Sequence, residues 1–347
     1  MKTIKIFILP FIILLSGIFG ACHKVIFKKN EKGNAAENFE YLWHQIYIKY
    51  SFFQYKNIDW QNVKSKYLPL ISSGMSDEEL FEACALMMNE LRDGHANLIA
   101  PFDASVYYPI FLNSPTNFDA RLVLTRYLMR HGANMQSTGA IDNCIIDTFG
   151  LKIGYLRYNS FMENLYTEDL DYILEKMMSC NGLILDVRSN GGGSSFNVFS
   201  LAGRFADTKR LAFKSYAKSG HGENDFDQGT NLYIQPQGKY QFTKPIAVLT
   251  NRGCYSATSF FTLAMKAFPY VKVIGDTTGG GLGVPNGGQM PNGWTYRFSV
   301  TQTISPDGKN YENGIPPDIT VWMSDSTLHP THDEIIERAI VYIRDGL

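Results

Sequence analysis

Apolar residues recur at helical spacing in two stretches near the start of the chain. Residues 37–50 place apolar and aromatic side chains on one side of a helix. A second helix is expected to begin after Ser76, because Glu79 three residues later completes a capping box. Gly94 is expected to end that helix in a left-handed conformation, which glycine adopts without strain. Residues 37–96 are therefore predicted to form a helical subdomain.

From residue 152 onward, short apolar runs alternate with helical patterns. The runs predict strands at 152–158, 183–187, 211–217, 246–250, 271–275 and, as one or two strands, 294–304. The helical patterns predict helices at 167–179, from 195, after Ser256 and from Thr331, where Glu334 completes another capping box. This alternation predicts an α/β core of βαβ-like units over residues 151–347.

Two stretches give weaker signals. Residues 97–150 contain short extended pieces and a possible strand or helix at 122–127, so they are interpreted as a connecting segment. Residues 218–239 are polar and rich in glycine, which favours a loop.

The composition is that of an ordinary globular protein, without internal repeats or low-complexity tracts. The 347 residues are 45% hydrophobic and 14% aromatic, which is enough for a large core. The 32 basic and 33 acidic side chains leave a net charge of -1. Nothing therefore favours binding to nucleic acid, which calls for a basic surplus.

The N-terminus has the pattern of an export signal. Lys2 and Lys5 precede a long apolar run and two small residues that lead into Cys22. This pattern predicts a signal peptide over residues 1–21 and a bacterial lipoprotein whose first mature residue is a lipidated Cys22, with residues 22–36 as a lipidated tether. The protein is then expected to be exported and anchored to a bacterial membrane, most simply the outer one, facing the periplasm or the cell surface. The alternative is an ordinary signal peptide that is cleaved nearby without lipid attachment.

The cysteines that follow Cys22 show no metal-ligand spacing. They are far apart in the chain, and the sequence does not determine their disulfide state: Cys84, Cys144, Cys180 and Cys254. No metal and no cofactor are expected.

The stretch 251–265, NRGCYSATSFFTLAM, joins an apolar run to a helical pattern through a tight turn that ends at Ser256. A serine in this place is most often an N-cap, whose hydroxyl accepts a hydrogen bond from the first helical turn. The alternative is that Ser256 is a nucleophile at a strand-to-helix turn. Cys254, two residues earlier, is a rival nucleophile.

Three further motifs carry candidate chemistry. His95 follows Gly94 in a turn that suits a rigidly held general base, although a lone histidine in a loop is more often a surface residue. Residues 186–195, DVRSNGGGSS, contain three consecutive glycines whose N–H groups can approach an oxyanion; a phosphate cradle and a simple tight turn are the alternatives. Glu312 lies in a rigid turn at 311–318 and is either a catalytic carboxylate or a solvated turn residue.

Taken together and in this order, the motifs resemble those of the C-terminal processing (tail-specific) and tricorn-core serine protease family. The matching stretches are 91–95, 186–193, 251–258, 273–280 and 312–318. The resemblance covers about residues 37–346 and implies a ClpP/crotonase-like protease core with an N-terminal helical subdomain. Many members carry a PDZ module after the histidine motif. Here the interval from His95 to Lys152 is short and lacks the glycine-rich carboxylate-binding loop of that module, so residues 97–150 are expected to contain no complete PDZ domain.

The resemblance also implies which residues act. One branch of the family uses a lysine base, and residues 277–288, where it would lie, contain no lysine. The other branch uses a histidine oriented by a distal glutamate. This implies Ser256 as the nucleophile, His95 as the base and Glu312 as the group that orients it, directly or through another residue. The oxyanion is expected to be held by the backbone N–H groups of Gly192 and Ala257. The side chains expected to fix the oxyanion loop are Asp186, Arg188 and Asn190.

The expected function is that of an exported serine endopeptidase that cleaves peptides or extended protein segments. The alternative is a non-catalytic ligand- or peptide-binding protein on the same scaffold, whose mark would be the loss of Ser256, His95 or Glu312; all three are present. An α/β-hydrolase is a weaker alternative, because the Gly-x-Ser-x-Gly motif is missing around Ser256. The sequence does not determine the natural substrate, the cleavage preference or the oligomeric state.

Overall fold

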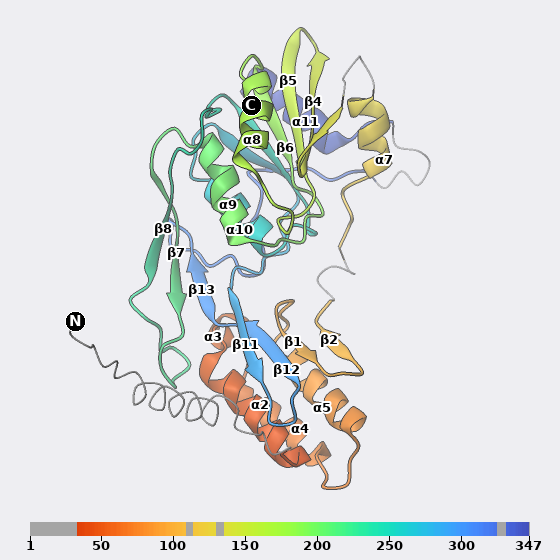
Figure 1. Ribbon diagram of the computed structural model, residues 1–347, viewed down its shortest axis with the longest axis vertical. Coiled ribbons are helices and arrows are strands. Elements are labelled where there is room, and N and C mark those ends of the chain that lie inside the picture. Colours follow the sequence, from red (N-terminus) through yellow and green to blue (C-terminus); the bar gives the residue numbers. More distant parts are fainter. Residues whose placement is uncertain (1–32, 109–113, 130–134, 325–330, 347) are drawn as a thin grey trace, which may run out of the picture.

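The computed structural model describes residues 33–108, 114–129, 135–324 and 331–346 (Figure 1). It has an α/β lobe that contains the C-terminal helix and a smaller lobe built mainly from the N-terminal helices. The predicted signal peptide, the lipidated Cys22 and most of the tether lie outside the described residues and stay predictions. Within the described residues, no helix has the length and apolar character needed to cross a membrane.

The centre of the α/β lobe is a seven-stranded sheet in the order β14-β10-β9-β6-β5-β4-β3. Strands β5, β6, β9, β10 and β14 are parallel, and β4 and β3 complete the sheet as antiparallel strands. The strand bounds are β3 Gln136–Thr138, β4 Ile141–Thr148, β5 Leu151–Tyr158, β6 Gly182–Asp186, β9 Ile246–Thr250, β10 Val271–Gly275 and β14 Ile319–Thr320. Strands β6 and β9 are buried on both faces, which explains their uninterrupted apolar sequences.

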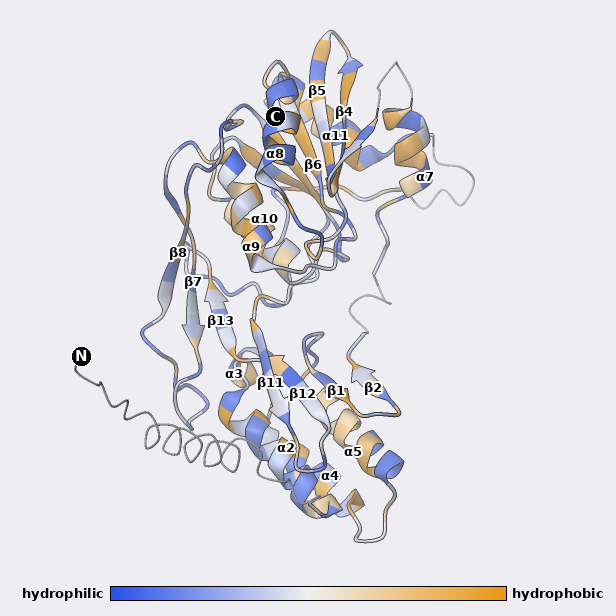
Figure 2. Ribbon diagram, viewed as in Figure 1, coloured by the Kyte–Doolittle hydropathy of each residue, from blue (hydrophilic) through white to orange (hydrophobic). Residues whose placement is uncertain are grey.

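Helices cover both faces of this sheet. On one face, α8 (Thr167–Met177), α9 (Ser195–Ala202) with the short η3 (Gly203–Phe205), and α10 (Ala257–Met265) pack onto buried apolar side chains. On the other face, α11 (Glu334–Asp345) packs together with α7 (Ala120–Val123) and η2 (Leu124–Leu128). The central strands are mostly orange in Figure 2 and the helices carry blue segments, as expected when helices bury one apolar face against a sheet.

The smaller lobe combines N-terminal helices with strands from the far end of the chain. Its helices are α2 Ala35–Lys49, α3 Phe53–Lys56, α4 Trp60–Tyr67, η1 Leu68–Leu70 and α5 Asp77–Asn89. Its four-stranded sheet has the order β11-β12-β1-β2, formed by β1 Asn97–Ile99, β2 Ala104–Val106, β11 Pro285–Gln289 and β12 Thr295–Ser299. Trp294 and Phe298 are buried in the core of this lobe. The segment from β11 to β12 lies inside the predicted unit 151–347 but belongs to the helical lobe. No single boundary in the sequence therefore divides the chain into the two lobes.

A third sheet connects the two lobes. It has the order β13-β7-β8, with β7 at Arg210–Ala217, β8 at Thr230–Ile234 and β13 at Thr301–Ile304 (Figure 1). Strand β13 follows β12 directly, so the chain passes from the helical lobe into this sheet without a long linker.

The α/β core and the helical N-terminal region are confirmed, but two predicted helix ends are wrong. Helix α5 ends at Asn89, and Arg92, not Gly94, takes the left-handed conformation with a φ of 49°. Gly94 serves close packing instead, because a Cβ there would lie 2.9 Å from the Tyr255 hydroxyl oxygen. Helix α11 is capped by Asp333, whose carboxylate accepts two backbone hydrogen bonds, rather than by Thr331.

Several strands were not predicted, β4, β8, β11 and β14 among them. Strand β8 lies within the supposed loop 218–239, and β4 and β11 had no clear signal. Strand β11 has the sequence PNGGQ, which lacks every residue type that favours strands; its pairing with β12 alone determines its conformation.

The burial of Trp294 provides a test of the helical lobe. Its side chain is 4% exposed, so Trp294→Ala is expected to lower the free energy of unfolding by about 3–5 kcal/mol. Trp322→Ala is the matched control, since Trp322 is 60% exposed and its loss should cost less than about 0.5 kcal/mol. Urea unfolding of both variants measures the difference; equal stabilities would contradict the assignment of β11 and β12 to this lobe.

Candidate active site

Ser256 stands at the sharp turn between β9 and α10. Its φ of 55° and ψ of -120° lie in a region that residues other than glycine rarely adopt. The Ser256 N–H donates to the Gly280 carbonyl at 3.0 Å, which holds this backbone in place. The hydroxyl makes no capping hydrogen bond to α10, so the N-cap interpretation of Ser256 is wrong.

The hydroxyl of Ser256 instead faces His95. The distance from His95 Nε2 to Ser256 Oγ is 3.0 Å, within hydrogen-bond range. His95 follows α5 in the helical lobe and is 5% exposed. Its ring lies against that of Tyr255, with the centroids 5.0 Å apart, and its backbone N–H donates to Asp93 Oδ1 at 2.8 Å. Two residues from different lobes thus meet at a nucleophile–base distance.

The environment of His95 favours the neutral imidazole. Burial lowers the pKa of His95 below its usual value, and the negative charge of Asp93 offsets this only in part. A neutral imidazole at neutral pH can accept a proton from a hydroxyl. Burial alone would raise the pKa of Asp93, but Lys56 and His95 lower it overall, so Asp93 keeps its charge beside the imidazole.

Glu312 is buried nearby, and among the described residues no hydrogen bond joins its carboxyl group to the imidazole of His95. Its Oε2 accepts hydrogen bonds from the N–H groups of Leu282 and Gly283, at 2.7 and 3.1 Å. Its Oε1 is 3.6 Å from Lys56 Nζ. Of the two links expected between Glu312 and His95, direct or through another residue, the structure offers the indirect one: Glu312 fixes the backbone of Gly283, and that backbone raises the pKa of His95.

Lys56, like Asp93, belongs to this site although neither was predicted from the sequence. Its ammonium lies 3.9 Å from Asp93 Oδ2 and 3.6 Å from Glu312 Oε1, and it donates to the Arg92 carbonyl at 3.1 Å. One buried cation is thus shared by two buried carboxyl groups. We call Lys56, Asp93 and Glu312 the charge cluster. Because Lys56 comes from α3 and Glu312 from the α/β lobe, this cluster also joins the lobes.

The glycine-rich loop after β6 is held by its own side chains. Arg188 is buried and binds Asp186 through two hydrogen bonds of 3.0 and 2.7 Å, and it reaches Asp333 at 2.8 Å. Asn190 Nδ2 donates to the Tyr158 carbonyl at 2.9 Å, and its Oδ1 accepts from the Gly192 N–H at 3.0 Å.

The glycine-rich loop lies against the start of α10. Of the two predicted oxyanion donors, the Ala257 N–H has no acceptor among the described residues, whereas the Gly192 N–H has one. A Cβ on Gly192 would lie 2.9 Å from the Ala257 nitrogen, so this approach requires glycine. Within the described residues, nothing accepts a hydrogen bond from the Ala257 N–H. Gly192, in contrast, is already bonded to Asn190, which contradicts its prediction as a free donor. The N–H of the next residue, Gly193, has no acceptor in the part of the chain that the structure describes.

Cys254 does not meet the requirements of a nucleophile. Its side chain is fully buried, and its thiol donates to the Val187 carbonyl at 3.0 Å. Burial raises the pKa of Cys254 to about 12, which keeps the thiol protonated. The four described cysteines are all free and buried. No group of acidic, histidine or cysteine side chains among the described residues could hold a metal ion.

The fold and the Ser256–His95 pair together define a serine–histidine site on an α/β core, and comparisons with known proteins place it in a family. The family model of peptidase family S41 matches residues 152–321, and that of the Tricorn protease C1 domain matches residues 33–89. A crystal structure from Parabacteroides merdae, described provisionally as a peptidase, is 36% identical over 90% of this chain and 97% of that one, with a TM-score of 0.83. The chain belongs to peptidase family S41.

More distant relatives agree with this assignment. The carboxy-terminal processing protease CtpA of Bacillus subtilis is 28% identical over 184 residues, which are 52% of this chain and 37% of that protein. The matched region thus spans little more than a third of this relative's length. Mature CPAF complexed with lactacystin is 13% identical, with a TM-score of 0.70 over 90% of this chain and 99% of that one, a likeness of fold alone.

The charge cluster leads to a pH-dependent prediction for Glu312. Burial, followed by the charge of Asp93, raises the pKa of Glu312 to about 8, so the folded protein holds this proton at pH values where the unfolded chain, with a pKa of about 4.3, has released it. The contribution of Glu312 to the free energy of unfolding should therefore fall as the pH rises from about 4 to about 8. Glu312→Gln should remove this part of the pH dependence while keeping an oxygen for Leu282 and Gly283.

Urea unfolding at pH 5 and pH 8 measures this effect. The wild type should lose more stability between the two pH values than Glu312→Gln does. Glu312→Ala is the contrasting variant, because each backbone N–H that it leaves unpaired should cost about 1–3 kcal/mol at both pH values. An identical pH dependence in the wild type and Glu312→Gln would contradict the assigned proton.

Proposed function

We propose that this protein is a serine peptidase in which Ser256 is the nucleophile and His95 the general base. The observation that carries the proposal is the 3.0 Å distance between His95 Nε2 and the hydroxyl of a strained Ser256. A hydroxyl released from helix capping and paired with a buried neutral imidazole has the arrangement of an activated nucleophile.

The proposed reaction follows the usual logic of acyl transfer. His95 Nε2 takes the proton of Ser256 Oγ as the oxygen attacks the scissile carbonyl, and the resulting imidazolium is stabilised by the charge of Asp93. The imidazolium then gives its proton to the leaving amine, and an acyl-enzyme forms on Ser256. Water, activated by the same imidazole, hydrolyses this ester and regenerates the enzyme.

The developing oxyanion needs hydrogen-bond donors close to Ser256. We assign the first to the Ala257 N–H, because it lies at the start of α10, where the helix dipole also favours negative charge. For the second we replace Gly192 by Gly193, whose N–H has no acceptor within the described residues. The bond from Gly192 to Asn190 then holds the loop while Gly193 serves the substrate.

Peptides and extended protein segments are the proposed substrates, and no metal or cofactor takes part. In this assignment Glu312 is a positioning residue, which keeps the backbone of Leu282 and Gly283 near His95. The competing function is a binding protein without catalysis. The intact pair of Ser256 and His95 favours the peptidase, since a binding protein has no use for a nucleophile at that distance from a base.

Labelling with a fluorophosphonate tests the nucleophile. The wild type should react covalently, and Ser256→Ala should not. Cys254→Ala is the control and should label like the wild type, because its buried thiol takes no part. A wild type that never labels would favour the binding protein, and loss of labelling in Cys254→Ala with retention in Ser256→Ala would reverse the assignment.

The pH profile of hydrolysis tests the base. Since burial lowers the pKa of His95, kcat/KM should stay constant down to pH values below those at which an ordinary histidine titrates, and should fall only at still lower pH. His95→Asn should reduce kcat/KM by about 10²–10⁴-fold. A profile that declines already below about pH 8 would instead indicate a base of higher pKa, such as a lysine.

A further inference from the structure

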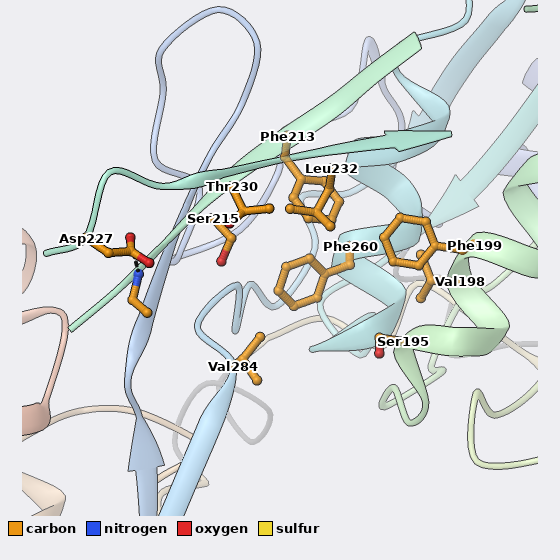
Figure 3. Close-up of a pocket in the computed structure, with 11 residues that line it drawn as sticks. Ser195, Val198, Phe199, Phe213, Ser215, Asp227, Thr230, Leu232, Phe260 and Val284 are labelled. Atoms are coloured by element: carbon orange, nitrogen blue, oxygen red, sulfur yellow. Dashed lines mark hydrogen bonds between the residues drawn. The ribbon is translucent and has the colours of Figure 1, made fainter. Parts of the chain in front are cut away.

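A largely apolar pocket of about 330 Å³ opens between α9, α10 and the hairpin of β7 and β8 (Figure 3). We call it the side-chain pocket. Its apolar walls are Val198, Phe199, Phe213, Leu232, Phe260 and Val284. In Figure 3 the side chains of Phe213, Leu232, Phe260 and Phe199 converge on its interior. A volume of this size corresponds to roughly ten water molecules, which leaves room for a bulky side chain.

Three segments of the chain that line the pocket also run to the proposed active site. Phe260 lies one helical turn after Ser256 on α10, and its N–H donates to the Ser256 carbonyl at 3.0 Å. Ser195 follows the glycine-rich loop that carries Gly193. Val284 follows Gly283, whose N–H is held by Glu312. The nucleophile, the oxyanion loop and the segment beside His95 therefore each continue into a wall of the pocket.

This position decides which part of a substrate reaches the pocket. The residue that contributes the scissile carbonyl has its Cα one bond, about 1.5 Å, from the carbon that Ser256 attacks. Its side chain therefore starts next to Ser256, and the side-chain pocket is lined by segments that continue from that place.

The one charged residue of the pocket lining, Asp227, does not favour a basic side chain there. Its Oδ1 already accepts hydrogen bonds from the N–H groups of Ala217 and Gly229, at 3.0 and 2.9 Å. It is exposed and lies at the end away from the aromatic rings in Figure 3. A lysine or arginine whose charge lies between the aromatic rings would be buried among apolar walls away from Asp227, which is unfavourable.

We propose that the side-chain pocket binds the residue on the amino side of the cleaved bond, and that it selects a bulky apolar side chain such as leucine, methionine or phenylalanine. This inference rests on the proposed peptidase function. Burial of such a side chain should raise kcat/KM about 10- to 100-fold over alanine at the same position. Charged side chains at that position should be cleaved more slowly still.

A series of peptides that differ only at this position tests the preference with the wild-type protein. Ser215→Asp adds a carboxylate to the pocket wall and should shift the preference toward lysine and arginine. Asn231→Asp is the matched control: it adds the same charge to the same hairpin, on the exposed β8 residue that does not line the pocket, and should leave the preference unchanged. Fluorophosphonate labelling of each variant shows that the site is intact.

The outcomes separate the two proposals. Normal labelling with cleavage that is indifferent to this side chain, or that prefers alanine or a charged residue, overturns the pocket assignment and leaves the peptidase standing. An unchanged preference in a labelled Ser215→Asp also overturns it. A wild type that neither labels nor cleaves any peptide overturns the peptidase and this inference together.

Discussion

The contact between His95 Nε2 and Ser256 Oγ is the interaction on which the proposed chemistry depends, and it joins two lobes. Ser256 is placed by the turn from β9 to α10, whereas His95 is placed by the helical lobe. The nucleophile and the base of the proposed pair thus come from different lobes. The relative position of the lobes must therefore be held to a fraction of an ångström, because a misplacement of 1 Å can cost about a hundredfold in rate.

Several interactions hold the lobes together at this place. The Ser51 hydroxyl of the helical lobe donates to the carbonyl of Thr301, in strand β13 of the connecting sheet, at 2.8 Å. Tyr255 packs against Gly94, where a side chain would collide with its hydroxyl. The charge cluster adds a buried ammonium between carboxyl groups of both lobes. Buried ion pairs contribute little net stability, so its effect is better understood as specifying one arrangement of the lobes.

Much of the α/β fold could be predicted because its central strands are buried on both faces and its helices are amphipathic. The motifs around Ser256 and His95 could also be recognised, since each stands at a junction with a distinct composition. Asp93 could have been selected from the sequence, because it is an acidic residue two positions before His95, the candidate base. Lys56 had no such signal: it ends a short helix with no regular pattern, and its partners are distant in sequence. The pairing of β11 and β12 with the helical lobe was missed for the same reason, because long-range pairing has no local pattern.

The most direct test of the central claim is a crystal structure of the protein with a peptide boronic acid. A boron bond to Ser256 Oγ, with His95 Nε2 within about 3.2 Å of that oxygen and a boronate oxygen on the Ala257 N–H, is the expected result. A boron atom on another side chain, a lysine amine in the place of His95, or an imidazole turned away from Ser256 would contradict it.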